Sequence, residues 1–240
     1  EEIATARAAL ERALSGAGGV LTVTGATGMG KTRLLMEALD GLAVDHRIVV
    51  RAEPYGSASA YRVFRDPARR LLGIERDEPE VMGRAMLATL QAVAPDLLPM
   101  APLLADVLMV DVPSTPEVDQ LDPQYRPDRL ADAVVRLMAE ALPGRILLVA
   151  EEAHWADAAS ARLMDRIAAS TVGRPWAVAS VRRPDPGGFA PNVGTKVTLQ
   201  PLPPEVIERL VIAATESTPL RPHEIAAVVD RAEGTPLYVE

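Results

Sequence analysis

The stretch of residues 20–39 constrains the fold of this chain more than any other. It opens with an apolar, β-branched run that indicates a buried parallel strand. The motif Gly25-x-x-x-x-Gly30-Lys31-Thr32 follows, and then a segment with leucines and alanines at helical spacing. Strand, glycine-rich loop and helix in this order predict a phosphate-binding loop. The alternative that the motif alone leaves open is a glycine-rich turn followed by an ordinary helix.

The chemistry of such a loop explains the residue types at this spacing. Glycines allow a sharp turn and a close approach to a ligand, and backbone N–H groups then face an anion at the positive end of the helix. Lys31 supplies a cation for the β- and γ-phosphates, and the Thr32 hydroxyl is a ligand for Mg²⁺. The predicted nucleotide-binding residues of this stretch are Gly25, Ala26, Thr27, Gly28, Met29, Gly30, Lys31, Thr32 and Arg33.

Composition limits the partners that we expect. The 240 residues carry a net charge of −8 without a long basic run, which disfavours direct nucleic-acid binding. There is no cysteine, so disulfides and cysteine metal sites are excluded. No apolar run approaches the roughly 20 residues that span a bilayer, and no signal peptide or initiator methionine is present. We therefore expect a cytoplasmic segment of a longer protein, with no membrane partner.

The hydrophobic pattern predicts an α/β core followed by a helical appendix. Strands are expected at residues 20–24, 47–52, 145–150, 176–181 and 196–199. Helices are expected at residues 3–14, before the first strand, and at residues 61–72, 82–93 and 130–141. The helix at 61–72 is expected to restart at Pro67 with Asp66 as its cap. The proline-rich residues 94–124 predict short helical pieces joined by loops. Residues 1–201 form the expected core, and residues 202–240 the truncated start of a helical lid.

Two carboxylates directly follow the third predicted strand. Glu151 and Glu152 come after the apolar residues 145–150. An apolar strand that ends in acids is typical of a site where one acid helps to hold Mg²⁺ and the other orients or deprotonates the attacking water. Adjacent residues of an extended strand point to opposite faces, so the acids need not share a role. We assign Glu151 to Mg²⁺ and Glu152 to water; the alternative is a strand that runs into a solvated acidic turn.

Further candidates follow these acids. Asp157 is predicted to cap a helix. His154 has two interpretations, a sensor of the γ-phosphate or a packing residue beside Trp155, and we favour packing. Arg183 ends the fourth predicted strand and is assigned to the γ-phosphate, the alternative being an arginine that solvates a turn. The three histidines are well separated, so no histidine metal site is indicated.

As a set, these motifs resemble the signal-transduction ATPases with numerous domains (STAND), within the AAA-like P-loop superfamily. More narrowly, the chain is similar to the ATPase module found behind bacterial class III adenylate cyclase domains and in large LuxR-type regulators. The most discriminating element is the acid-acid-x-His-Trp-x-Asp block. The resembling segments are residues 25–32, Pro54-Tyr55-Gly56, residues 99–105, residues 151–157, Arg183-Pro184-Asp185 and Gly234-Thr235-Pro236-Leu237.

The resemblance implies a three-layer α/β/α P-loop NTPase fold with a five-stranded parallel sheet in the order 5-1-4-3-2 and a small C-terminal helical lid. It implies a slowly hydrolysing switch that uses ATP/ADP and Mg²⁺, closed with ADP and open or self-associating with ATP. It also implies effector domains outside these residues, and it places Pro236 over the nucleotide in the closed state. The acid pair of the family often includes an aspartate, whereas both acids are glutamates in this chain.

Three functions compete at this stage. An ATP-hydrolysing regulatory switch is favoured. The second is a nucleotide-binding clamp with little or no hydrolysis that serves interaction or oligomerisation. The third is a small-molecule kinase or a GTPase, but no Asn-Lys-x-Asp motif for guanine is present and no acceptor site for a kinase is evident.

Overall fold

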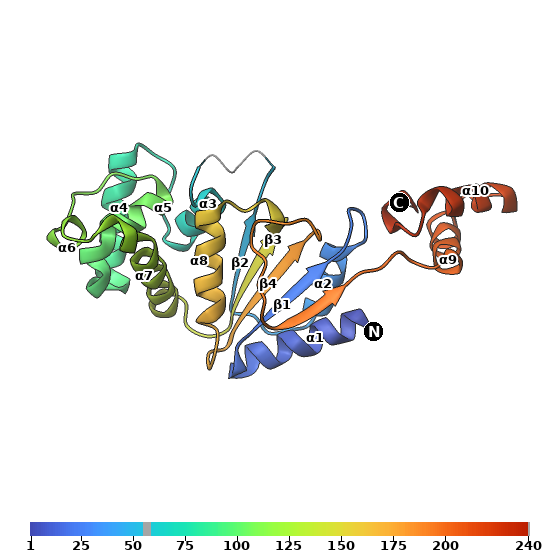
Figure 1. Ribbon diagram of the computed structural model, residues 1–240, viewed down its shortest axis with the longest axis horizontal. Helices are drawn as coiled ribbons and strands as arrows, with labels where there is room; N and C mark the ends of the chain where they lie inside the picture. The colour runs from blue at the N-terminus through green and yellow to red at the C-terminus, as the bar shows by residue number, and fades with distance from the viewer. Residues whose placement is uncertain (55–58, 240) are drawn as a thin grey trace.

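The computed structural model describes residues 1–54 and 59–239, so most of the Pro54-Tyr55-Gly56 segment lies outside the described residues. Within them, five strands form one parallel sheet in the order β2-β3-β4-β1-β5 (Figure 1). This order is 5-1-4-3-2 counted from the other edge, which confirms the predicted topology. The strands are β1 (Gly19–Thr24), β2 (His46–Arg51), β3 (Ile146–Glu151), β4 (Trp176–Arg182) and β5 (Thr195–Thr198).

Helices cover both faces of the sheet, and Figure 1 shows the three layers. They are α1 (Glu2–Arg12), which continues into a π-helical turn (Ala13–Ala17), α2 (Lys31–Leu39), α3 (Arg62–Leu71), α7 (Arg126–Ala141) and α8 (Ala158–Ala169). On β3, Leu147 and Val149 share a hydrophobic cluster with α1 and α2. Ile146 and Leu148, which point to the other face, share a cluster with α3, α7 and α8. The apolar strands are therefore buried on both sides, as parallel strands require.

A helical group packs beyond α7, at the β2 end of the sheet (Figure 1). Met86, Leu90, Leu104 and Leu108 form its core together with Leu137 of α7. The group begins with α4 (Pro79–Val93), where a helix was predicted at residues 82–93. The proline-rich residues 94–124 then form short pieces, as predicted: a 3₁₀ turn (Pro95–Met100), α5 (Ala101–Leu108), α6 (Pro116–Asp119) and a second 3₁₀ turn (Pro123–Tyr125).

Helix α3 runs without interruption through Pro67, so the predicted restart with Asp66 as a cap is wrong. The helix instead begins after Tyr61, a residue in the left-handed region at φ 57°. Proline removes one helical hydrogen bond, but Phe64 and Leu71 on either side of it pack against the same core. This packing holds the helix together, and the Asp66 carboxylate is left to pair with arginines.

The chain ends in a small helical unit beside the β5 edge of the sheet (Figure 1). It contains α9 (Pro204–Ala214), α10 (Pro222–Ala232) and a 3₁₀ turn (Pro236–Val239). Ile207, Val211 and Ala232 are its buried residues, and they form a cluster of their own. None of the helices in the described part of the chain has the length and apolar character needed to cross a membrane.

Candidate functional site

The phosphate-loop motif leaves the carboxyl end of β1 and enters α2, as predicted. Gly28 and Gly30 both have a φ of 78°, a conformation that favours glycine. Within the described residues, no acceptor takes a hydrogen bond from the backbone N–H groups of Gly30, Lys31 or Thr32. The loop therefore presents unpaired donors at the positive end of α2, where an anion binds most readily.

Lys31 is a buried cation inside this loop. Its side chain is 7% exposed, and its Nζ donates a 2.8 Å hydrogen bond to the carbonyl oxygen of Ala26. Burial lowers the pKa of Lys31, Glu152 acts in the opposite direction, and Arg183 lowers it further. Lys31 is therefore within electrostatic reach of Glu152 and Arg183, which lie 3.9 Å apart although they are far from Lys31 in sequence. An ammonium group has three donors, so Lys31 retains capacity for a phosphate.

The two acids leave β3 in different backbone conformations. Glu151 is the last residue of the strand, and its carbonyl oxygen accepts from the amide of Ala52 at 3.0 Å. Glu152 lies in the left-handed region at φ 49° and ψ 38°. The expectation that both acids sit on an extended strand is therefore wrong for Glu152. A non-glycine residue in this region is uncommon and is often found at functional sites.

His154 joins Glu152 to the end of β4. It belongs to a 3₁₀ turn (Ala153–Trp155), and only 5% of its surface is exposed. Its Nδ1 accepts a 3.3 Å hydrogen bond from the backbone N–H of Arg183, and its Nε2 lies 3.5 Å from a carboxylate oxygen of Glu152. Burial lowers the pKa of His154, which favours the neutral ring. Because Nδ1 accepts the hydrogen bond from Arg183, the proton of the neutral ring lies on Nε2, facing Glu152. The ring also packs on Trp155, with centroids 5.0 Å apart.

The contacts of His154 were only partly foreseen. The predicted packing on Trp155 is present, but the bridge between Glu152 and Arg183 was not anticipated. The only sequence signal for it was a histidine two residues after an acid. Its partner on β4 lies far away in the chain.

The two consecutive arginines at the end of β4 have different surroundings. Arg183 Nε lies 3.9 Å from a carboxylate oxygen of Glu152 and has no hydrogen-bond acceptor within the described part of the chain. Arg182 is 6% exposed and donates to the carbonyl oxygens of Asp185 and Phe189. Arg182 therefore holds the loop after β4, while Arg183 faces the candidate site.

The C-terminal turn lies on the phosphate loop. The amide of Leu237 donates to the carbonyl oxygen of Gly28 at 3.2 Å. A Cβ on Gly28 would lie 2.8 Å from both the Leu237 Cβ and a Thr235 methyl. Pro236 stands between these two contacts. On its other side the turn is held by Leu202, whose amide donates to the Gly234 carbonyl oxygen at 2.8 Å.

The residues present fit a polyphosphate accompanied by Mg²⁺. The loop N–H groups, Lys31 and the unpaired Nε of Arg183 supply positive charge. Thr32 is exposed at the first turn of α2, and the acids follow β3. No group of three or more histidines or acids suited to a metal ion occurs among residues 1–54 and 59–239. Mg²⁺ takes few protein ligands and uses phosphate oxygens and water for the rest, so Thr32 and one acid would be sufficient protein ligands for it.

Residues 1–176 match a protein-family model described as "AAA ATPase domain". The chain is also similar to the crystal structure of a signal-transduction ATPase with numerous domains that carries a tetratricopeptide repeat sensor, from Pyrococcus horikoshii. The identity is 15% and the TM-score is 0.44, covering 96% of this chain and 28% of that one. This chain thus spans little more than a quarter of that protein. No curated protein matches.

Proposed function

This chain belongs to the AAA ATPase domain family, and from that premise we propose that it is an ATP-binding, slowly hydrolysing regulatory switch module of a larger signalling protein. The observation that carries the proposal is the convergence of Lys31, Glu152 and Arg183 beside a loop with unpaired N–H groups. Two cations and one acid are the groups that phosphoryl transfer to water requires at one place.

Each site residue has a role in this proposal. The loop amides and Lys31 bind the phosphates, and Arg183 stabilises negative charge on the γ-phosphate. Thr32 and Glu151 hold Mg²⁺, which when bound neutralises charge on the β- and γ-phosphates. Glu152 orients the attacking water, and its carboxylate lies within 3.5 Å of His154 Nε2 and 3.9 Å of Arg183 Nε. We assign the rest of the loop and Arg33 to phosphate contacts.

The lid completes the proposed switch. We treat residues 1–201 as the core and residues 202–240 as the start of the lid. The turn around Pro236 is proposed to close over ADP and to open with ATP, when the module self-associates. Its contact with Gly28 supports this role, since a ligand in the loop would meet the turn directly. The input and effector domains are proposed to resemble those of cyclase-linked or LuxR-type regulators, in the cytoplasm and without direct contact to nucleic acid or membrane.

A clamp with little hydrolysis is the second candidate. The observation that favours it is the double engagement of Glu152 by His154 and Arg183. A carboxylate that faces these two side chains is less free to take the position that the attacking water requires. In that case the module would bind ATP and use the lid and the bound state for interaction, without turnover.

The test measures binding and hydrolysis separately. Mg-ATP binding by calorimetry is expected to weaken by at least about tenfold in Lys31→Ala, because a charge-assisted phosphate contact is lost. Lys196→Ala is the matched control, an exposed lysine on β5 whose loss leaves binding unchanged. Equal affinity in Lys31→Ala and the unaltered chain would refute the site. Single-turnover hydrolysis then separates the two candidates: ATP that stays intact while bound selects the clamp.

A further inference from the structure

A second polar pocket opens beside the edge strand β2, outside the phosphate-loop site. Its volume is about 400 Å³, and β2, α3 and the segment after Glu152 wall it. The pocket is rich in positive charge, although the whole chain carries −8. Its charged lining residues are the arginines Arg51, Arg62, Arg65, Arg69 and Arg70 and the acids Glu53, Asp66 and Asp157.

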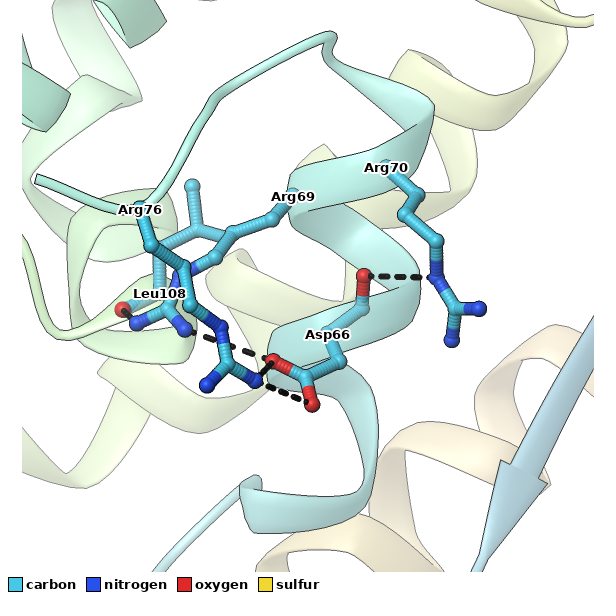
Figure 2. A network of polar contacts seen from close by, with 5 residues as sticks. All are labelled: Asp66, Arg69, Arg70, Arg76 and Leu108. Atoms are coloured by element: carbon cyan, nitrogen blue, oxygen red, sulfur yellow. Dashed lines mark hydrogen bonds and ion pairs between the residues drawn. The ribbon is translucent and has the colours of Figure 1, made fainter.

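The acid at the centre of α3 is already paired with two arginines, one of which, Arg76, lies outside the pocket lining (Figure 2). Arg76 donates to both carboxylate oxygens of Asp66 at 2.8 Å, and Arg69 reaches one of them at 3.3 Å. Figure 2 shows that Arg70 turns away from this carboxylate and bonds only the backbone carbonyl oxygen of Asp66. Asp66 therefore does not compensate the charge of Arg70.

The other two acids are also engaged. Glu53 pairs with Arg62 at 3.3 Å. Asp157 caps α8, where its carboxylate accepts from the amide of Ser160 at 2.9 Å and from its hydroxyl at 2.6 Å. Within residues 1–54 and 59–239, this leaves Arg51, Arg65 and Arg70 without a carboxylate in ion-pair contact.

Arg65 has electrostatically unfavourable surroundings in this pocket. Its guanidinium donates to the Ala60 carbonyl oxygen at 3.2 Å and to the Ser59 hydroxyl. Its Nε is buried and has no acceptor in the described part of the chain. Burial lowers the pKa of Arg65, as do Arg62 and Arg69 nearby. Crowded guanidinium groups with an unsatisfied buried donor are costly unless an anion joins them.

The same pocket has an apolar wall. Trp155, Met109 and Val49 line it and remain exposed to 38%, 57% and 36%. A ligand that satisfies the whole lining must carry both negative charge and a flat or apolar part. Arginine forks bind phosphate oxygens in pairs, and an aromatic face accepts a flat ring. A pocket of this volume holds a small molecule rather than a folded partner.

We propose that this pocket binds a small phosphate-bearing molecule with a flat ring, of the nucleoside monophosphate type, at a site separate from the phosphate loop. The phosphate contacts Arg65 and Arg70, and the ring lies against Trp155. This site goes beyond the ATP site proposed above and does not depend on it. The two are neighbours, since Trp155 packs on His154 and His154 faces Glu152.

The chain provides its own probe, because it has two tryptophans, Trp155 in the pocket and Trp176 in the core. In a Lys31→Ala, Trp176→Phe chain, the emission reports Trp155 alone while nucleotide binding at the loop site is weakened. Titration with AMP is expected to change this emission saturably, and calorimetry confirms the binding. Adenosine, which lacks the phosphate, is expected to bind at least about tenfold more weakly.

Arginine variants decide whether the pocket is responsible. Arg65→Gln with Arg70→Gln is expected to weaken AMP binding at least about tenfold. Arg84→Gln, an exposed arginine on α4, is the matched control and leaves binding unchanged. If the double variant does not fold, Arg70→Gln alone carries the test, because Arg70 is exposed.

Four results would overturn the proposal. They are no AMP binding by either method, equal binding of adenosine and AMP, unchanged affinity in the arginine variants, and binding of an oligoglutamate peptide in place of AMP. The last result would assign the pocket to an acidic protein segment. All titrations use the Lys31→Ala background. If the ATP site proposed above proved wrong, these results would still decide whether the pocket binds AMP.

Discussion

The amide of Leu237 donates a hydrogen bond of 3.2 Å to the carbonyl oxygen of Gly28, which ties the C-terminal turn to the phosphate loop. The approach is so close that a Cβ on Gly28 would lie 2.8 Å from the Leu237 Cβ. Glycine is therefore required here for the contact as well as for its φ of 78°. A ligand that changes the conformation of the phosphate loop must therefore displace the C-terminal turn or contact it.

Pro236→Ala is expected to narrow the difference between ADP and ATP affinity. Proline fixes its own φ and so sets the angle of the turn that meets Gly28. A ligand shifts a two-state equilibrium only through its differential affinity for the states, so a looser turn reduces the preference for ADP. The ratio of ADP to ATP dissociation constants, measured by calorimetry, checks this.

Pro222→Ala is the matched control for the lid. Pro222 begins α10 in the same unit, so its substitution perturbs the lid without touching the turn. We expect its ADP/ATP ratio to equal that of the unaltered chain. An unchanged ratio in Pro236→Ala as well would show that the turn is only a helix-breaking element.

The two acids are expected to separate binding from turnover. Glu152→Gln should lower the hydrolysis rate by about a hundredfold or more while ATP affinity stays within about threefold, because the residue acts on water. Glu151→Gln should lower both the rate and the Mg²⁺ dependence of binding, because the role proposed for Glu151 is to hold the ion. Rates by single turnover and affinities at several Mg²⁺ concentrations distinguish them. If neither variant changes the hydrolysis rate, the nucleotide-binding clamp becomes the favoured function.

Arg183 and Arg182 form a matched pair. Arg183→Gln is expected to slow hydrolysis and leave thermal stability unchanged, because the side chain is partly exposed and faces Glu152. Arg182→Gln is expected to lower the free energy of unfolding by about 2–3 kcal/mol, since the carbonyl oxygens of Asp185 and of the buried Phe189 lose a charged donor. Urea unfolding and turnover are measured on both. If Arg183→Gln destabilised the chain as much as Arg182→Gln does, the proposed role of Arg183 in hydrolysis would be refuted.

Much of the fold could be predicted because its signals are local. Apolar β-branched runs marked all five strands, and the glycine pattern after β1 marked the loop and the start of α2. The strand order came from resemblance rather than from periodicity. Pro67 misled the prediction because local propensity was weighed without the core contacts of Phe64 and Leu71, which the sequence does not display.

The candidate site was predicted less completely, because its contacts join distant segments. The identity of the acids was evident, but the left-handed backbone of Glu152 was not, since a non-glycine residue gives no signal for it. The pairing of His154 with the Arg183 amide depends on the alignment of β3 with β4. The arginine pocket went unnoticed because its side chains come from parts of the chain that are far apart in sequence.

The last prediction concerns the dependence of stability on pH. Burial is the main cause that lowers the pKa of His154 below its ordinary value of 6.5. Glu152 and Asp185 favour the charged ring, while Arg183 and Arg182 oppose it. The unfolded chain therefore takes up a proton near pH 6.5 that the folded chain does not. Stability is lost as the pH falls below 6.5, and the loss ends once the pH passes the lowered pKa of the folded state.

His154→Asn is expected to weaken this dependence. Asparagine keeps a polar group near the Arg183 amide but does not titrate. The free energy of unfolding of the variant should therefore fall less between pH 7.5 and pH 5.5 than that of the unaltered chain. The difference is at most about 1.4 kcal/mol per pH unit, the value for one proton. Urea unfolding at both pH values measures it, and subtraction cancels the carboxylates common to both chains. His223→Asn, at an exposed position of α10, should behave like the unaltered chain. An identical pH response in His154→Asn would show that the folded chain binds this proton as readily as the unfolded one.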